Sequence, residues 1–439
     1  MSKVLRNRLV LLFGFVFIDL LGYSLFLPLL PFYVADLGGT PALVGILVAS
    51  NALAQFFAGP IIGRLSDRFG RRPLLILSIS GTLASFLLLG LIEPLGDLLA
   101  GLAPERITVA GGALVMLFSS RILDGLFGGD VSLAQAYITD VTDEKNRARG
   151  LGLIGAAFGM GFIIGPAMGG TLANWDYAIS AFAAVGLSRY AVPAFAAVLL
   201  SALNLLAVVI LLPESLPPEK RAEVANSPRS AFTARCLWNC ITRPRFGTLL
   251  RIRFFYFLAF TIFTANFALY AQYRLGLTDQ TTSYILTYVG ILVVLVQGVA
   301  IGRLTARFTE TRLIFTGVSI LGTALLAWAL VPSLVPLMVV LTAFPLAGGV
   351  LNTVTNSAIT KSVYAEEVGG ALGLSSSLDS MARVIAPIVG GFLLQQWGGG
   401  SLGLVGALIM AFVIFHVWRR LVVNPDPHLA GRAQEEMSR

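Results

Sequence analysis

Five charged side chains lie deep inside stretches of this sequence that are otherwise apolar and long enough to cross a membrane. They are three aspartates and two arginines: Asp19, Arg121, Asp124, Asp379 and Arg383. A charge within the hydrocarbon of a bilayer is costly, so such residues are functional candidates by default. Asp19 differs from the others because no Lys or Arg lies within one helical turn of it in the sequence. Burial favours the protonated form of a carboxyl group. We therefore predict that Asp19 couples the protein to protons, with Arg121 as its partner across a helix interface.

The other four charges are spaced so that they can pair along a helix. Arg121 and Asp124 stand at i,i+3, and Asp379 and Arg383 stand at i,i+4. Residues at these spacings are neighbours on one helix face. Each pair could therefore be structural, or Arg121 and the two aspartates could join Asp19 in proton coupling. Arg383 could instead bind an anionic group of a substrate.

Polar uncharged and aromatic residues in the same apolar stretches predict an amphipathic cavity. Amides can orient a ligand while aromatic rings cover its apolar part. A single aromatic residue is equally compatible with packing inside a helix bundle. The residues predicted to contact substrate are Tyr23, Phe26, Asn51, Gln55, Asn266, Tyr270, Gln297, Asn352, Asn356 and Arg383.

The composition predicts that these residues are positioned by membrane-spanning helices. The chain has 439 residues, of which 56% are apolar and only 12% charged, which excludes an ordinary soluble globule. One crossing needs roughly 20 apolar residues. We predict an all-α membrane protein with twelve transmembrane helices, at residues 9–34, 41–62, 74–93, 109–139, 148–172, 190–212, 248–273, 283–302, 312–331, 333–358, 368–395 and 401–421.

The basic residues predict which side of the membrane is the cytoplasm. With both termini inside, 26 of the 31 Lys and Arg residues fall at inner ends of the predicted helices, which is the positive-inside pattern. The net charge of +8 then reflects topology, and nucleic-acid binding is not expected. We expect no cofactor, because no phosphate-binding sequence G-x-x-x-x-G-K-[ST] occurs. No histidine completes a metal site with Cys236 and Cys240.

Two halves of the sequence repeat each other. The sequence GRLSDRF from Gly63 reappears as GRLTARF from Gly302, and IGPAMGG from Ile164 reappears as IAPIVGG from Ile385. Copies that both start inside are parallel repeats, which place a site between them at mid-depth. We predict an N-terminal six-helix bundle at 1–212, a cytoplasmic linker at 213–247 and a C-terminal six-helix bundle with a short tail at 248–439. Residues 229–242 of the linker could lie on the membrane surface as an amphipathic helix.

Two motifs stand where helices meet or end. The basic fragment from Gly63 to Pro73 separates the second and third predicted helices, and the fifth helix is rich in glycine, which lets another helix approach closely. Asp130 lies toward the inner end of the fourth helix. The resemblance of these motifs to those of a transporter family implies a role in conformational gating for Gly63, Asp67, Arg68, Gly70, Arg71, Arg72, Asp130, Gly161, Gly165, Pro166 and Gly169.

These motifs resemble a known family. The fragment G-x-L-x-D-R-x-G-R-R from Gly63 is similar to the loop between helices two and three of major facilitator transporters. The first helix, FIDLLGYSLFLP from Phe17, and the fragment RILDG from Arg121 resemble those of the tetracycline-type drug:proton antiporters. The resemblance implies two pseudo-symmetric bundles of the major facilitator fold, a latch at Asp67 and its neighbouring arginines, and a coupling role for Asp19 and Arg121. Ser85 stands where those pumps have an acid, which argues against tetracycline itself.

The sequence therefore predicts a proton-coupled secondary transporter and no enzyme. We expect it to export amphipathic organic compounds, anionic or zwitterionic, by alternating access. The alternatives are a lipid or metabolite transporter that imports or equilibrates its substrate, and a sensor that no longer transports. The expected partners are the small organic substrate, protons and the lipid bilayer. We expect a monomer in a bacterial inner membrane.

Overall fold

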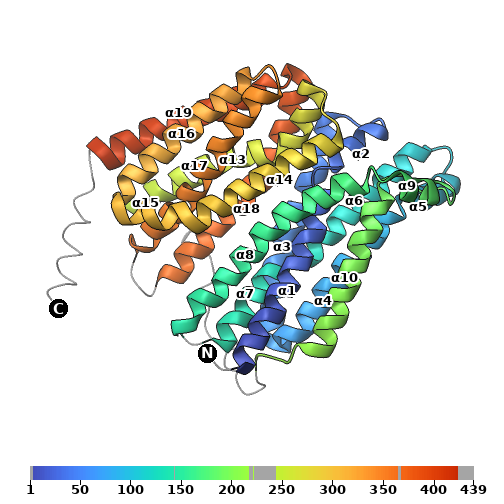
Figure 1. Ribbon diagram of the computed structural model, residues 1–439, viewed down its shortest axis with the longest axis horizontal. Coiled ribbons are helices and arrows are strands. Elements are labelled where there is room, and N and C mark those ends of the chain that lie inside the picture. The colour runs from blue at the N-terminus through green and yellow to red at the C-terminus, as the bar shows by residue number, and fades with distance from the viewer. Residues whose placement is uncertain (1–2, 143, 217–220, 222–243, 364–366, 424–439) are drawn as a thin grey trace. The chain divides into compact units, whose positions relative to one another are not determined.

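The computed structural model of the protein describes most of the chain, and the described residues are helices with short connections (Figure 1). Twelve of their helical segments are long and apolar enough to cross a membrane, as the sequence predicts. The proposed surface helix at 229–242, with Cys236 and Cys240, lies outside the described residues. The structure describes residues 3–142, 144–216, 221, 244–363 and 367–423, without the side chains of residues 3–8, 130, 144–149, 244 and 369.

The chain forms two compact units. The first comprises Met1–Pro228 and Ala268–Ile291, and the second comprises Arg229–Phe267 and Leu292–Arg439. Two consecutive helices, α13 and α14, therefore each contribute residues to both units.

The first unit contains ten helices in its described residues before α13. They are α1 (Lys3–Phe26), α2 (Leu30–Asp36), α3 (Pro41–Phe69), α4 (Arg71–Gly90), α5 (Ile92–Leu102), α6 (Val109–Phe127), α7 (Asp130–Val141), α8 (Glu144–Leu172), α9 (Asp176–Ala183) and α10 (Ala191–Leu211).

Helix boundaries in this unit follow glycine and proline. The first predicted span is broken between α1 and α2, next to Pro28 and Pro31, because proline cannot continue the hydrogen-bond ladder. The fourth is broken between α6 and α7 at Gly128 and Gly129. The basic fragment from Gly63 was expected to be a loop, but α3 continues through it to Phe69. Only Gly70, at φ +107°, interrupts the backbone before α4 begins.

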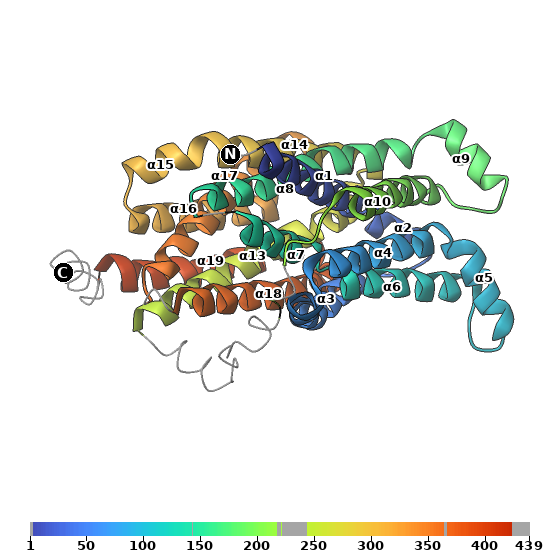
Figure 2. The same ribbon diagram turned by 90° about the horizontal axis from the view of Figure 1, so that it is seen from below.

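Helices α1 and α8 lie side by side in both views (Figures 1 and 2). Their contact is lined by the glycines predicted from the sequence. A Cβ atom at Gly161 would meet Leu20, one at Gly165 would meet Ser24, and one at Gly169 would meet the Leu25 backbone. The Ser24 hydroxyl donates a hydrogen bond to the Gly161 carbonyl at 2.8 Å. Spacing of four residues thus gives α8 a smooth face against which α1 packs closely. Pro166 lies inside α8 beside this face.

Two more close approaches place the 268–291 segment in the first unit. A Cβ atom at Gly170 of α8 would collide with Ser283, and one at Gly290 would collide with the Phe162 backbone. Small residues therefore let α8 contact α14 as well as α1.

The second unit is built around an aromatic cluster. Phe263 stacks on Phe344 with ring centroids 3.7 Å apart and meets Trp328 edge-on at 5.0 Å. A short π-helix, η1, follows α14, and another, η3, ends the described chain. The described helices from α13 onward are α13 (Pro244–Leu275), α14 (Asp279–Leu295), η1 (Val296–Ala300), α15 (Ile301–Arg307), α16 (Glu310–Leu330), α17 (Leu334–Thr360), α18 (Val368–Trp397), α19 (Gly400–Val417) and η3 (Trp418–Val423).

Candidate functional site

The first unit contains a buried ion pair at the level of the predicted cavity. Arg121 Nη1 lies 3.7 Å from Asp124 Oδ2 on α6, which confirms the pairing expected from the i,i+3 spacing. Asn51 of α3 links both residues, because its Nδ2 donates to Asp124 Oδ2 at 2.9 Å and to the Arg121 carbonyl at 3.0 Å. Arg121 is 2% and Asp124 7% exposed. A buried pair of this kind is stable only if further hydrogen bonds satisfy both charges; Asn51 supplies one to the Asp124 carboxylate.

Small residues hold the helices close enough for these contacts. A Cβ atom at Gly125 would collide with the Asn51 backbone, so glycine lets α6 reach α3. On its other side Arg121 donates to the hydroxyls of Ser85 at 3.4 Å and Ser120 at 3.5 Å. Ser85 is the position where tetracycline pumps have an acid. Here its hydroxyl contacts the guanidinium, and it also donates to the Ser120 carbonyl at 3.0 Å.

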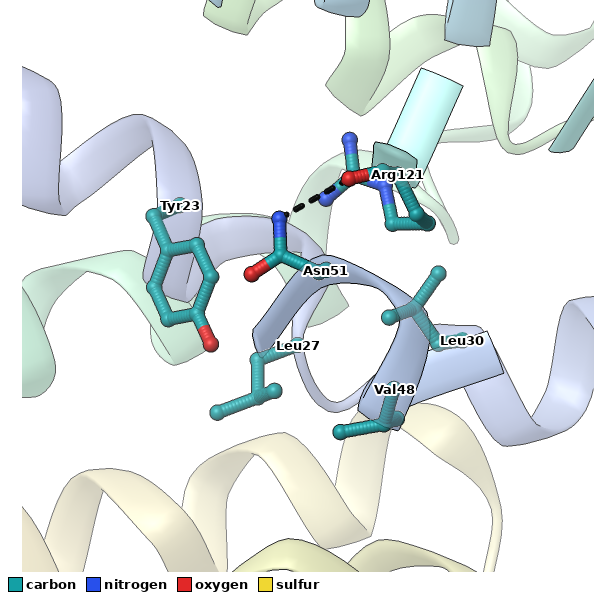
Figure 3. A pocket seen from close by; sticks show the side chains of 6 residues that line it. All are labelled: Tyr23, Leu27, Leu30, Val48, Asn51 and Arg121. Carbon is teal, nitrogen blue, oxygen red and sulfur yellow. Dashed lines mark hydrogen bonds between the residues drawn. The ribbon is translucent and has the colours of Figure 1, made fainter. Parts of the chain in front are cut away.

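A small hollow, with room for about one water molecule in this state, opens beside this ion pair (Figure 3). Apolar side chains from α1 to α3 form most of its wall, and Asn51 and Arg121 supply its polar part. This combination suits a molecule with an apolar body and a polar group. The lining residues are Tyr23, Leu27, Leu30, Val48, Asn51 and Arg121.

Asp19 lies one helical turn before Tyr23 on α1 and is half-buried. Residues four apart share a helix face, so Asp19 is on the side of α1 that carries Tyr23 toward the hollow. The residues that follow it, Leu20 and Leu21, pack against Gly161 of α8. The glycine face of α8 therefore fixes the position of this part of α1 along α8.

The second unit contains a buried charge cluster that the sequence analysis assigned differently. The spacing allowed Asp379 of α18 to pair with Arg383, but its ion-pair partner is Arg253 of α13. Arg253 Nη2 lies 2.6 Å from Asp379 Oδ2, and its Nε donates to Asp379 Oδ1 at 3.1 Å. Arg253 also donates to Asn352 Oδ1 at 3.3 Å and to the Thr355 hydroxyl at 3.4 Å, both on α17. The charge pattern grouped Arg253 with the cytoplasmic basic residues, whereas the structure buries it at 4% exposure.

The remaining predicted contact residues of this unit lie around the cluster or away from it. Asn356 donates to Asn352 Oδ1 at 3.4 Å, and Arg383 lies over the Phe257 ring at 5.8 Å. Asn266 instead joins α13 to α18, donating to the Ala386 carbonyl at 3.2 Å. Gln297 is exposed on η1.

Three other predicted contact residues belong to the first unit. Phe26 is fully buried at 0% exposure and Tyr270 at 1%, so neither presents surface to a ligand in this state. Gln55 is exposed and donates to the Gly128 carbonyl at the break between α6 and α7.

The residues predicted to gate the protein form a network at the predicted inner end of the first unit. Asp67 Oδ1 pairs with Arg71 Nη1 at 2.7 Å, and Arg71 Nε pairs with Asp140 of α7 at 3.0 Å. The Ser66 hydroxyl accepts from Arg71 at 2.6 Å. Ser215, after α10, donates to the same Asp140 oxygen atom at 3.1 Å.

Glu214 caps the start of α4 in this network. Its carboxylate accepts from the backbone N–H groups of Arg71 at 2.9 Å and Arg72 at 3.2 Å, and a negative charge is favourable at a helix N-terminus. A Cβ atom at Gly70 would collide with this carboxylate. Sequence reasoning missed Asp140 and Glu214, since neither lies inside an apolar stretch. The available signal was their position, since Asp140 lies in the last turn of α7 and Glu214 just after α10, both at the predicted inner side.

Four further gating residues lie outside these contacts. Arg72 donates to the Val209 carbonyl at 2.6 Å, and Arg68 lies 5.5 Å from the Phe69 ring. Gly63 has open space around its Cα. The side chain of Asp130 lies outside the described residues. Among the residues described, no three His, Cys, Asp or Glu side chains gather into a metal site.

The motifs and the fold are matched by a known family. The family described as Major Facilitator Superfamily matches residues 12–363 and 252–438 of this chain. The chain belongs to the major facilitator superfamily. The fold class predicted from the sequence is confirmed, and the protein is an integral membrane transporter, not an enzyme.

Relatives within this superfamily include named resistance proteins. The tetracycline resistance protein of class C from Escherichia coli is 30% identical over 392 residues, covering 88% of this chain and 89% of that protein. Multidrug resistance protein 2 of Bacillus subtilis is 26% identical over 396 residues, covering 88% and 89%. Solute carrier family 22 member 18 of Mus musculus is 28% identical over 397 residues, covering 89% and 90%.

Solved structures of other major facilitator proteins share the fold. The human organic anion transporter MFSD10 (TETRAN) is 21% identical, with a TM-score of 0.64 over 95% of this chain and 100% of that chain. A mutant of the nucleoside transporter NupG is 14% identical, with a TM-score of 0.71 over 94% and 99%. At these identities the likeness concerns the fold alone.

Proposed function

We propose that the protein is a proton-coupled secondary transporter that exports amphipathic organic compounds, anionic or zwitterionic, by alternating access. The observation that carries the proposal is the hollow in the first unit beside a buried ion pair, with Asp19 one helical turn away on α1. In this proposal the apolar wall holds the body of the substrate, Asn51 and Arg121 orient its polar group, and Asp19 carries the proton.

Export is supported by the relatives. Those named for tetracycline resistance and multidrug resistance cover nearly the whole chain. A resistance protein of a transporter family protects the cell when it lowers the internal concentration of a compound. The short apolar wall of the hollow and its one arginine suit a drug-like molecule with a single polar end.

Alternating access is supported by the inner network. Arg71 holds Asp67 and Asp140, and Glu214 holds the start of α4, so four segments of the first unit are joined at one end. We infer that this network is made in one state of the cycle and broken in another, and that the predicted gating residues act there. We further propose a bacterial inner-membrane protein that acts as a monomer with both termini in the cytoplasm.

The test is transport by purified protein in proteoliposomes with an imposed pH gradient. Fluorescent organic anions, zwitterions and cations are offered, and their accumulation is compared with and without the gradient. Wild-type protein is expected to accumulate a subset against its concentration only when the gradient is present. Asp19→Asn should abolish this gradient-driven accumulation, because an amide cannot take up the proton.

The matched control is Glu105→Gln, which removes a carboxylate at an exposed site outside the spans. It should transport like the wild type. Gradient-driven accumulation that persists in Asp19→Asn would remove Asp19 from the mechanism. Equilibration without accumulation in the wild type would instead support the facilitator alternative.

A further inference from the structure

The charge cluster of the second unit carries one more positive than negative charge. It consists of Arg253 on α13 and of Asp379 and Arg383 on α18, all within the same compact unit. Arg253 holds both oxygen atoms of Asp379. Within the described part of the chain, Arg383 makes no ion pair and lies over the Phe257 ring. Two guanidinium groups and one carboxylate leave a net charge of +1.

The position of Arg383 indicates that lipid does not cover this face of α18. Arg383 is exposed and lies near the middle of a 30-residue helix. Ser376, Asp379 and Ser380 share its face, because they precede it by seven, four and three residues respectively. A guanidinium against lipid tails at this depth is costly. The face therefore borders water or a bound molecule.

Neighbouring groups are arranged to hold the arginines in place. Asn352 and Thr355 accept from Arg253 at 3.3 Å and 3.4 Å, so all three nitrogen atoms of its guanidinium are engaged. Asn352 is itself exposed beside the pair. Phe257 offers an apolar ring surface next to Arg383. The other ionisable group near Asp379 is the phenol of Tyr256 on α13, which is buried.

We propose that Arg383 binds the anionic group of an aromatic organic monoanion, whose ring lies against Phe257, and that the buried Arg253 contributes its positive charge without contacting the ligand. A planar guanidinium matches the geometry of a carboxylate or sulfonate group. One monoanion neutralises the cluster without any proton, so Asp379 serves to orient Arg253 and to limit the charge of the empty site to +1. Asp379 then takes no part in the proton coupling predicted for it from the sequence. The inference rests on the proposed function and adds the residues and the charge of the substrate group.

The experiment measures binding of naphthalene-2-sulfonate to purified full-length protein in nanodiscs by isothermal titration calorimetry. This probe keeps its charge at every accessible pH, and naphthalene-2-sulfonamide is its uncharged analogue. The sulfonate is expected to bind at one site and the sulfonamide at least tenfold more weakly. Arg383→Gln should weaken binding of the sulfonate by about tenfold or more, as loss of a charge-assisted hydrogen bond does. Arg251→Gln is the matched control, because Arg251 is an exposed arginine of the same unit, on α13, that donates to the Gly247 carbonyl.

The direction in which Asp379→Asn changes the affinity for the sulfonate distinguishes a binding site from a purely structural ion pair. The substitution raises the net charge of the cluster to +2, so the sulfonate should bind several-fold more tightly. The empty variant should also unfold at a lower temperature, because Arg253 then lacks its counter-charge. A purely structural ion pair would lower stability and leave binding unchanged or weaker.

The proposal is overturned if the wild type does not bind naphthalene-2-sulfonate, or if Arg383→Gln binds it as the wild type does. It is also overturned if Asp379→Asn binds it more weakly. These outcomes are distinct from failure of the proposed function, because the titration involves no proton gradient. Gradient-driven transport of cations or zwitterions that persists without sulfonate binding would preserve the exporter and reject only the anion site.

Discussion

Arg121 lies between the Ser85 hydroxyl of α4 and the Asp124 carboxylate of α6. A substitution of Ser85 therefore tests whether Arg121 can accept a second carboxylate. The Ser85 hydroxyl lies 3.4 Å from Arg121 Nη2. Ser85→Asp would place a carboxylate against an existing guanidinium, so the fold should tolerate it, with a change in unfolding free energy of about 1 kcal/mol or less. Ser78→Asp is the matched comparison on the same face of α4. Ser78 contacts the Phe127 carbonyl, and a carboxylate facing a carbonyl should cost about 3 kcal/mol or more.

Thermal unfolding of the two variants in detergent, followed by size-exclusion chromatography, measures this difference. Ser85→Asp should elute and melt like the wild type, and Ser78→Asp should be recovered poorly or melt well below it. Equal losses in both variants would show that Arg121 is already fully satisfied by Asp124.

The charged residues of the two buried clusters could be predicted only where the charge lies inside an apolar stretch of the sequence. Arg121 and Asp124 satisfy that condition, and their pairing is as expected from spacing. Arg253 was missed because it follows Arg245 and Arg251, so composition places it with the basic inner end. Its partner is 126 residues away in sequence, and no local pattern predicts a contact at that distance.

At the scale of helices, the contact between α1 and α8 depends on the absence of side chains. A Cβ atom at Gly165 would collide with Ser24, whereas one at Gly155 of the same helix would meet nothing within 4 Å. Gly165→Ala must therefore push α1 away or distort it, which we expect to lower the unfolding free energy by about 1–3 kcal/mol. Gly155→Ala should leave it equal or slightly higher, because alanine favours a helix over glycine.

The melting temperatures of these two alanine variants, purified in parallel, check the prediction. Gly165→Ala should also reduce transport, since α1 carries Asp19 and Tyr23. Identical melting of both variants would mean that α1 and α8 are held by other contacts.

Helix existence was predictable, and helix ends were less so. Twelve apolar stretches predict twelve spans, because crossing a bilayer demands length and hydrophobicity that few other structures need. The fragment from Gly63 looks like a loop by charge, yet α3 runs through it. Arginine and aspartate are compatible with a helix that leaves the hydrocarbon, and only the left-handed backbone of Gly70 ends it.

At the scale of the molecule, α13 and α14 are shared by both units. A network at the predicted outer end holds the start of α14 in the first unit. Arg189 Nη1 lies 3.3 Å from Asp279 of α14, and its Nη2 lies 3.4 Å from Asp36 of α2. Tyr190 donates to Asp36 at 2.6 Å. Burial, followed by this hydrogen bond, raises the pKa of the Tyr190 hydroxyl, so it remains a neutral donor.

Arg189 keeps its charge in this network. Burial lowers its pKa, but Tyr190, Asp279 and Asp36 oppose that effect, and the pKa ends above its ordinary value. Asp279 is only 3% exposed, and a buried carboxylate left without its cation is strongly destabilising. In the alternating-access cycle that we propose, we expect this contact to be made and broken once per cycle. Its loss should therefore loosen the start of α14 first.

We expect Arg189→Gln to increase hydrogen–deuterium exchange in residues 279–291 while leaving the inner half of the first unit protected. Arg106→Gln is the control, because it removes an exposed outer arginine from the turn before α6. Asp279→Asn should restore part of the protection in the Arg189→Gln background, since an amide tolerates burial without a counter-charge better than a carboxylate does. Unchanged exchange of residues 279–291 in Arg189→Gln would mean that the close glycine contacts of Gly170 and Gly290 suffice to hold α14. The ion pair would then have no part in the movement of the outer helix ends.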